Sequence, residues 1–143
     1  MAYEYTFVII KPGAVLRRQV GEIMSRYERA GMSIDVLRFS GPMPEVFWKE
    51  FYGDLHTRIP MEAYLNHIQY MAGGPVVPMT LVGRDVIERV RLLNGATNPL
   101  RAAPGTIRGD LGRELPDNVV HASDSQESVD REFKFWETFL EVR

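Results

Sequence analysis

Residues 3–10 of this chain are YEYTFVII, and they run directly into Lys11-Pro12-Gly13. Aromatic and β-branched side chains fill this run, which predicts a buried strand that ends in a turn. Apolar residues then recur at helical spacing between Val20 and Ala30, and Gly31 follows where a helix-terminating glycine belongs. Alternating apolar and polar residues from Ser33 to Phe39 predict a second strand. The chain therefore opens with a β-α-β pattern.

The middle of the chain predicts two helices, a third strand and one further helix. Pro44 opens the stretch PEVFWKEFYGDL with proline in the first helical turn, and Glu62 to Met71 is again helical in pattern. The run VVPMTLV, Val76 to Val82, predicts a strand in which Pro78 indicates a sheet edge or a bulge. We expect Asp85 to cap a helix that extends to Leu93.

The rest of the chain begins with a long stretch, Ala96 to Asp117, that is rich in Pro, Gly and Arg. Irregular loops of this length in compact domains are usually functional or disordered. Asn118 to His121 predicts a brief fourth strand, and Ser123 to Gln126 matches an S-x-x-Q capping box. The helix that follows is expected to turn apolar residues inward, namely Val129, Phe133, Trp136 and Phe139 or Leu140.

The expected elements follow the order β-α-β-α-α-β-α-loop-β-α. This order has two β-α-β-like halves, and it suggests one layer of helices covering a small sheet. No repeat, low-complexity segment or inter-domain linker interrupts the sequence. We therefore expect residues 1–143 to form a single domain.

Composition narrows the classes of partner and compartment. The formal net charge of −2 gives no general attraction to nucleic acid or to an anionic membrane surface. No apolar run approaches the roughly 20 residues that cross a bilayer, and the N-terminus does not resemble a secretion signal. The absence of cysteine removes disulfides, thiol catalysis and cysteine-ligated metals, and it fits a cytoplasmic protein. Any anion site must be built locally from a few basic side chains.

His121 stands where the fourth strand meets the last helix. A lone histidine at the end of a strand is, by itself, most simply a partly buried structural residue. At this seam, however, its side chain can sit at the sheet edge beside backbone N–H groups that attract anions. A neutral imidazole is also a nucleophile at cellular pH.

Basic side chains occur near this histidine in the expected fold. Arg101, Arg108 and Arg113 lie in the long stretch, where arginine can hold phosphate oxygens bidentately, and Lys11 ends the first strand. Each of these residues alone could equally be solvated. The sequence contains neither a G-x-x-x-x-G-K-[ST] loop nor a G-x-G-x-x-G motif. A histidine with arginines but without a glycine cradle favours phosphoryl transfer through a covalent phosphohistidine.

Six short motifs occur in an order and spacing that chance does not reproduce. They are TFVIIKPGAV (6–15), VGEI (20–23), GGPVV (73–77), TNP (97–99), PGTIRGD (104–110) and NVVHASDS (118–125). On these motifs the sequence resembles nucleoside diphosphate kinase along nearly its whole length. The resemblance implies an α/β (α+β) fold, a ferredoxin-like sandwich in which helices cover a four-stranded antiparallel sheet.

The resemblance also implies an activity, a cofactor and partners. The activity is ping-pong transfer of the γ-phosphate from a nucleoside triphosphate, typically ATP, to a nucleoside diphosphate through a phosphohistidine. Mg²⁺ would arrive with the nucleotide, held by phosphate oxygens and water, so no protein side chain is assigned to a metal. The family forms homo-oligomers, hexamers or tetramers built from dimers.

Residues close to the reacting phosphorus are implied by the matching motifs. His121 corresponds to the phosphorylated nucleophile, and Glu132 to the carboxylate that orients its imidazole through the second ring nitrogen. Tyr52 and Ser123 match residues that lie close to the histidine. Judged without the family, Glu132 would be a solvent-facing residue of the last helix.

Residues that hold the nucleotide are implied in the same way. Lys11 and Asn118 match the positions that hold the sugar hydroxyls. Arg91, Thr97 and Arg108 match the positions that hold the phosphates. Because the transferred group is a dispersed anion, the two arginines can supply the compensating charge.

Four departures from the family pattern are expected to affect nucleotide affinity and base handling more than the chemistry. Gly13-Ala14 stands where the family has D-G, and Ala122 replaces the glycine after the nucleophile, which disfavours positive φ there. Residues 58–64, RIPMEAY, replace R-P-F-F and its base-stacking phenylalanine, and we expect Tyr64 to pack into the helix instead. His56 stands where the family usually has lysine.

Two other functions compete with an active kinase. One is a nucleotide-binding or regulatory module of the same fold without turnover, although a module that does not turn over has little need of the nucleophile. The other is a ferredoxin-like RNA-binding domain. That class requires exposed aromatics in a K/R-G-F/Y motif and a basic balance, and this chain has neither.

Overall fold

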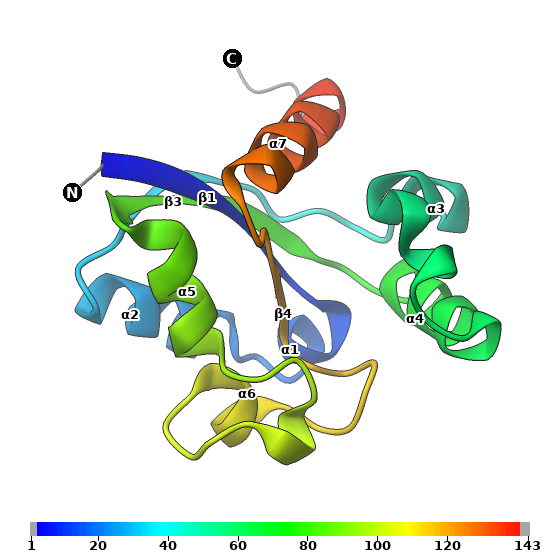
Figure 1. Cartoon of the computed structure of the whole chain (residues 1–143), viewed down its shortest axis with the longest axis horizontal. Helices are drawn as coiled ribbons and strands as arrows, with labels where there is room; N and C mark the ends of the chain where they lie inside the picture. The colour runs from blue at the N-terminus through cyan, green and yellow to red at the C-terminus, as the bar shows by residue number, and fades with distance from the viewer. Residues whose placement is uncertain (1–2, 141–143) are drawn as a thin grey trace.

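The computed structural model describes residues 3–140 and contains a four-stranded antiparallel sheet in the order β2-β3-β1-β4 (Figure 1). The strands are β1 (Tyr3–Ile10), β2 (Ser33–Leu37), β3 (Val77–Arg84) and β4 (Val120–Ala122). This sheet, together with the helices that pack on it, confirms the expected ferredoxin-like α+β fold. Among the described residues no helix is long and apolar enough to span a membrane.

Helices cover both faces of the sheet, whereas the sequence suggested one layer. They are α1 (Pro12–Leu16), α2 (Val20–Arg29), α3 (Glu45–Tyr52), α4 (Met61–Ala72), α5 (Val86–Asn94), α6 (Ile107–Leu111) and α7 (Gln126–Leu140). The reason lies in the second half of β1, where residues 6–10 are all buried: Val8 and Ile10 pack with α2 and α5, while Phe7 and Ile9 pack with α3, α4 and α7. A strand that is apolar on both faces needs a helical layer on each.

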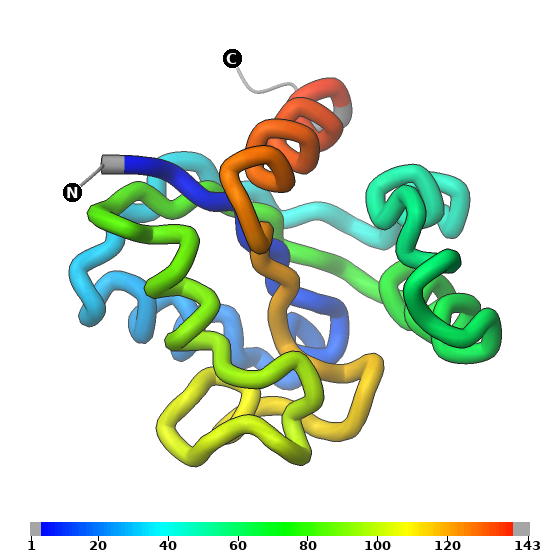
Figure 2. Tube along the Cα trace, in the orientation of Figure 1, coloured from blue at the N-terminus to red at the C-terminus, as the bar shows by residue number. Residues whose placement is uncertain are grey.

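The α3–α4 pair projects from one end of the sheet, between β2 and β3 in the chain (Figures 1 and 2). A 3₁₀ turn, η1 (Gly53–Thr57), joins the two helices. On α7, Val129 and Trp136 are buried and Phe133 is half-buried, as the helical spacing predicted, while the side chains of Phe139 and Leu140 lie outside the described part. Trp136 packs against aromatic residues of α3, so α7 and α3 share one apolar core.

Three expected local features differ in the structure. The turn predicted at Lys11-Pro12-Gly13 is the start of helix α1, with Pro12 in its first turn. Pro78 lies in β3, which is a central strand. A proline is tolerated there because the pairing of β2 with β3 ends beside it, and its carbonyl still accepts from the backbone N–H of Arg38. The register shift expected near Pro78 occurs instead in β2, between Ile34 and Val36.

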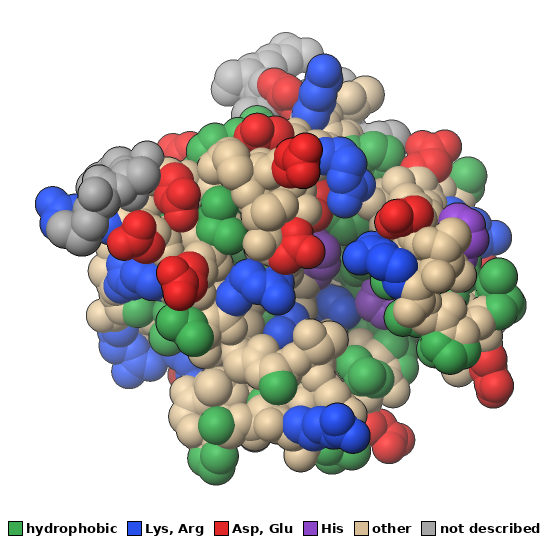
Figure 3. All heavy atoms as spheres, in the orientation of Figure 1, with side chains coloured by type: hydrophobic (Ala, Val, Ile, Leu, Met, Phe, Trp, Pro, Cys, Tyr) green, Lys and Arg blue, Asp and Glu red, His purple; other side chains and the backbone are tan. Residues whose placement is uncertain are grey.

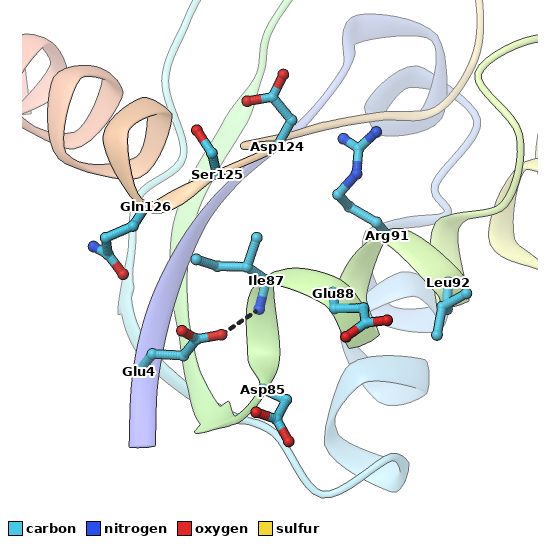
Figure 4. A pocket seen from close by; sticks show the side chains of 9 residues that line it. All are labelled: Glu4, Asp85, Ile87, Glu88, Arg91, Leu92, Asp124, Ser125 and Gln126. Atoms are coloured by element: carbon cyan, nitrogen blue, oxygen red, sulfur yellow. Dashed lines mark hydrogen bonds between the residues drawn. The ribbon is translucent and has the colours of Figure 1, made fainter. Parts of the chain in front are cut away.

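Helix caps also differ from the sequence expectation. Asp85 precedes α5, but its side chain makes no capping bond; the carboxylate of Glu4 accepts from the backbone N–H of Ile87 instead (Figure 4). At α7 the capping oxygen belongs to Ser125, which accepts from the N–H of Ser128 at 3.2 Å. Ser123 does not cap this helix: its hydroxyl donates to Glu132, and its own N–H pairs with the carbonyl of Phe7 in β1. Backbone pairing with β1 therefore extends to Ser123, the residue that the capping-box pattern places at the start of the helix.

The long stretch between α5 and β4 is ordered rather than irregular. It contains a 3₁₀ turn, η2 (Pro99–Arg101), and α6. Thr106 caps α6 by accepting from the N–H of Gly109. The tube in Figure 2 shows this segment lying below β4, on the side of the sheet end where α1 begins. It is thus placed to form one wall of a site at that end.

Candidate active site

His121 lies in β4, directly opposite Ile9 of β1. Its side chain is 20% exposed, and its Nε2 atom hydrogen-bonds the carboxylate of Glu132, whose side chain is only 4% exposed. The hydroxyl of Ser123 donates to the same carboxylate oxygen at 3.2 Å. Nδ1 of His121 has no hydrogen-bond partner among residues 3–140. Glu132 is therefore a buried partner of the histidine, and not a solvent-facing residue of α7.

Aromatic rings from α3 flank the imidazole. The rings of Phe51 and Tyr52 meet the ring of His121 edge to face, with centroid separations of 5.3 and 5.7 Å. Burial is the main cause that raises the pKa of the Tyr52 phenol, and the nearby charge of Glu132 adds to the effect. Tyr52 is thus a neutral hydroxyl beside His121 at any physiological pH.

Lys11 is buried at the end of β1, only 4% exposed. Its Nζ donates to Oδ1 of Asn118 at 2.6 Å, and Nδ2 of Asn118 donates to the carbonyl of Thr97 at 2.9 Å. The pKa of Lys11 is lowered to about 7, mainly by burial and also by the positive charge of Arg108, while Asp117 opposes both. The three residues form a chain of hydrogen bonds that joins β1 to the segment before β4.

The two arginines expected at the phosphates differ in environment. The guanidinium of Arg108 donates to the three carbonyls of Asn118, Gly95 and Val120, at distances of 2.7–3.1 Å. Arg108 therefore ties the 96–117 segment to β4 as well as bringing positive charge to it. Arg91, by contrast, is exposed on α5 and lines the cavity that contains His121.

That cavity has a volume of about 260 Å³. Its lining combines the imidazole of His121 with guanidinium groups and carboxylates, namely Arg58, Arg91, Arg131, Asp54, Asp124 and Glu132. Figure 3 shows histidine and basic side chains gathered in a hollow bounded by α7, the α3–α4 pair and the segment that contains α6. Three guanidinium groups and three carboxylates line this cavity beside the imidazole, so an anion bound there can contact cations close to His121.

A larger cavity, of about 570 Å³, lies beside α5 and does not contain the histidine (Figure 4). It shares Arg91 and Asp124 with the first cavity, and its remaining charged residues, Glu4, Asp85 and Glu88, are all acidic. An acidic groove repels phosphates. We therefore locate the candidate active site at the smaller cavity.

The residues that depart from the pattern of the resemblance are accommodated locally. A Cβ atom on Gly13 would come within 2.3 Å of Oδ1 of Asp117 and 2.6 Å of the Tyr70 hydroxyl, so these side chains fill the space a larger residue would need. Ala122 of β4 pairs with Val8 of β1, and its φ is not positive, so its methyl group causes no backbone strain. Tyr64 is 7% exposed and packs in the α3–α4 core, as expected.

Residues beyond the expected set also contribute to this region. Asp117 binds Arg17 and accepts from the Tyr70 hydroxyl, which itself accepts from the N–H of Gly13. This network ties the segment before β4 to α1 and α4. His67 of α4 packs against Tyr52. Neither Asp117 nor His67 belongs to a motif that sequence reasoning could have used.

Comparison with known proteins decides the family. The family model for nucleoside diphosphate kinase matches residues 4–141. The chain belongs to the nucleoside diphosphate kinase family. Nucleoside diphosphate kinase 3 of Homo sapiens is 45% identical over 135 residues, 94% of this chain and 78% of that protein. Nucleoside diphosphate kinase of Methanosarcina mazei is 46% identical over 129 residues, 90% of this chain and 84% of that protein.

The fold agrees with solved structures of the nucleoside diphosphate kinase family. The enzyme of Borrelia burgdorferi, solved as a transition-state mimic with bound vanadate and ADP, superposes with a TM-score of 0.86. That comparison covers 94% of this chain and 86% of the other, at 33% identity. The sequence comparison and the structural comparison therefore agree on the family.

Proposed function

We propose that this chain transfers the γ-phosphate of a nucleoside triphosphate to a nucleoside diphosphate by a ping-pong mechanism, with His121 as the nucleophile. The observation that carries this proposal is the bond between Nε2 of His121 and the buried carboxylate of Glu132. A carboxylate can only accept, so Nε2 holds the ring proton and Nδ1 keeps its lone pair for attack. Membership of the nucleoside diphosphate kinase family supports the same reaction.

The two half-reactions follow from this geometry. The lone pair of Nδ1 attacks the γ-phosphorus in line, the bond to the β–γ bridging oxygen breaks, and the nucleoside diphosphate leaves with that electron pair. A terminal oxygen of a second diphosphate then attacks the phosphohistidine and restores Nδ1. Glu132 stabilises the positive charge that develops on the ring during the first attack. Ser123 holds the Glu132 carboxylate in place.

The cationic residues are suited to hold the nucleotide in this reaction. We expect Lys11 and Asn118, which hydrogen-bond each other, to bind the sugar hydroxyls, and Arg91 and Arg108 to supply positive charge to the phosphates. Thr97 contributes its carbonyl to the orientation of Asn118. Tyr52 adds a neutral hydroxyl beside the imidazole.

We infer that Mg²⁺ enters with the nucleotide. Among the described residues no group of three or more His, Asp or Glu side chains could hold a metal ion. We therefore expect phosphate oxygens and water to coordinate the ion. There it would neutralise charge on the transferred group. Assembly into a hexamer or a tetramer built from dimers stays a prediction of the family resemblance, and a cytoplasmic location stays a prediction of the composition.

The proposal is tested by labelling with ATP that carries a radioactive γ-phosphate. We expect an acid-labile phosphoenzyme on the wild-type chain and none on His121→Ala. The matched control is His56→Ala, because His56 is an exposed histidine of η1 and its loss should leave labelling intact. Labelled His121→Ala protein would contradict the role of His121. Conversion of GDP to GTP with ATP separates an active enzyme from a module that binds nucleotides without turnover.

A further inference from the structure

Arg131 of α7 lies beside the Glu132 carboxylate, and the proposed function gives it no role. Its side chain lines the cavity that contains His121 and is 57% exposed. One terminal nitrogen, Nη2, lies 3.5 Å from Oε2 of Glu132, and the other, Nη1, donates to the carbonyl of Phe51 at 3.1 Å. The guanidinium group therefore stands between this carboxylate and the last turn of α3.

The two oxygens of the Glu132 carboxylate have different partners. Oε1 is hydrogen-bonded to Nε2 of His121 and accepts from the hydroxyl of Ser123. Oε2 has Arg131 as its partner among residues 3–140. A carboxylate rotates easily about its terminal bond, because that torsion has broad minima. A contact on each oxygen therefore restricts the carboxylate to the orientation in which Oε1 faces the imidazole.

The carbonyl of Phe51 gives the guanidinium group a fixed position. Phe51 lies in the last turn of α3, where carbonyls lack the partner that a continuing helix would supply. This end of a helix also carries partial negative charge, which favours a cation such as Arg131. The N–H groups of a guanidinium form a rigid planar fork, so one side chain can contact the carbonyl and Oε2 together. Helix α3 thus supports the Glu132 carboxylate through Arg131.

Arg131 differs in this respect from the other two arginines of the cavity. Arg58 pairs with Asp54 of η1 at 3.3 Å, and Arg91 belongs to α5 and also lines the larger cavity. Neither contacts Glu132 within the described part of the chain. A half-exposed ion pair such as that of Arg131 with Glu132 contributes little to stability. Its effect should therefore appear in the orientation of the carboxylate rather than in the free energy of unfolding.

We propose that Arg131 is a positioning residue for phosphoryl transfer, which holds Oε2 of Glu132 beside the end of α3 and so keeps Oε1 on Nε2 of His121. This inference rests on the proposed function, because it gives Arg131 a part in preparing Nδ1 for attack. While Oε1 stays on Nε2, the ring proton stays there too, and the lone pair of Nδ1 is available to the γ-phosphorus. Without Arg131 the carboxylate rotates more freely, and this arrangement is populated for a smaller fraction of the time.

The experiment measures single-turnover phosphorylation of His121 by saturating ATP in the full chain, and compares Arg131→Met with Arg131→Lys. Methionine keeps an unbranched side chain and removes the charge and every N–H, while lysine keeps the charge. We expect Arg131→Met to slow phosphorylation about fivefold, the size of one half-exposed ion pair, and Arg131→Lys to recover part of that loss. A wild-type rate in Arg131→Met would overturn the proposal.

ADP affinity, measured by calorimetry, separates positioning from nucleotide binding. It should fall less than the phosphorylation rate in Arg131→Met, because the proposed role acts through Glu132. An equal or larger fall in ADP affinity would overturn the proposal and identify Arg131 as a phosphate-binding residue. The matched control is Lys134→Met, which removes an exposed positive charge of α7 that does not line the cavity and should leave the rate unchanged. An equal loss of rate in the control would assign the effect to net charge, against the proposal.

A double-mutant cycle with Glu132→Gln tests whether Arg131 acts through the carboxylate. If it does, Arg131→Met should cause little further loss of rate in the Glu132→Gln chain, since the oriented carboxylate is already gone. A loss of the same size in both backgrounds would overturn the proposal. It would mean that the guanidinium group contacts the transferred phosphoryl group directly or only stabilises the fold.

Nitrogen-15 NMR of the His121 ring keeps this inference separate from the proposed function, because it requires no phosphoryl transfer. We expect the Nε2–H tautomer in the free wild-type chain and a mixture of tautomers in Arg131→Met. A chain that shows this change but whose wild type forms no phosphoenzyme would overturn the proposed function alone. Normal phosphoenzyme formation, with the same rate and the same tautomer in Arg131→Met, would overturn the role of Arg131 alone.

Discussion

The two walls of the active cavity differ in how their polar groups are satisfied. On the β4–α7 wall, His121, Ser123 and Glu132 are joined by hydrogen bonds within the protein. On the α3–α4 wall, the hydroxyl of Tyr52 and Nε2 of His67 are buried without such partners. The first wall is therefore preorganised for chemistry, while the second carries buried polar atoms that the described residues leave unpaired. Variants on the two walls should affect stability with opposite sign.

Glu132→Gln breaks the preorganised wall and should have the largest effect among these tests. The amide has no charge to stabilise the developing imidazolium, and its NH₂ group can favour the wrong ring tautomer. We expect phosphorylation of His121 to slow by roughly 10²–10⁴-fold in single-turnover measurements, as for other carboxylates that orient a catalytic histidine. Glu137→Gln, an exposed change on the same helix, is the control. Equal rates in both variants would remove Glu132 from the mechanism.

Lys11 lies at the sheet end between the two walls, and it makes the comparison dependent on pH. Burial and Arg108 lower its pKa to about 7 in the free chain, and a bound nucleotide anion should restore the proton. Nucleotide binding then requires proton uptake above pH 7. We expect ADP affinity to fall on the order of tenfold between pH 7 and 8.5, measured by calorimetry in buffers of different ionisation enthalpy.

The free energy of unfolding of the free chain should rise with pH, whereas ADP affinity falls. Between pH 7 and 9 the unfolded chain keeps Lys11 protonated, since its ordinary pKa is 10.5, while the folded chain has released that proton. The unfolded state then binds more protons, so the free energy of unfolding rises with pH, by about 1.4 kcal/mol per pH unit at most. Lys11→Met should flatten both profiles. A wild-type affinity that does not change with pH would show that Lys11 stays charged.

The fold was more accessible to sequence reasoning than the details that build the site. Apolar periodicity in residues 3–10 and 20–30 predicted β1 and α2, because these segments bury their side chains in regular patterns. The cap of α7 was assigned to Ser123 instead of Ser125, since both are small and polar, and only pairing with β1 distinguishes them. Such choices depend on contacts between distant residues.

Sequence reasoning likewise identified some residues of the candidate site and missed others. Motifs carried the resemblance that led to His121 and Glu132, and the structure brings these two side chains together. No local pattern indicated His67, because one histidine in a helix is compatible with a core, a surface or a ligand. Nor did any pattern indicate Asp117, which fills the space beside Gly13. Both positions gain their meaning from neighbours that are remote in sequence.

Tyr52→Phe sharpens the comparison with the smallest expected change. It deletes a buried hydroxyl that has no partner among the described residues, so the free energy of unfolding of the free chain should rise by about 1 kcal/mol. Steady-state turnover should fall several-fold, about as much as one weak hydrogen bond to the transferred group. Chemical denaturation and a coupled assay measure the two effects.

Tyr27→Phe is the matched control, because it deletes a hydroxyl that donates to Oδ1 of Asn94 at 2.6 Å in a fully buried position. That change leaves the amide oxygen unpaired and should lower the free energy of unfolding by about 1–2 kcal/mol. Opposite signs in the two variants mean that hydroxyl burial alone does not decide stability; the presence of a partner does. Equal losses of stability in both would mean that Tyr52 is satisfied within the free protein, and the two walls would then be alike.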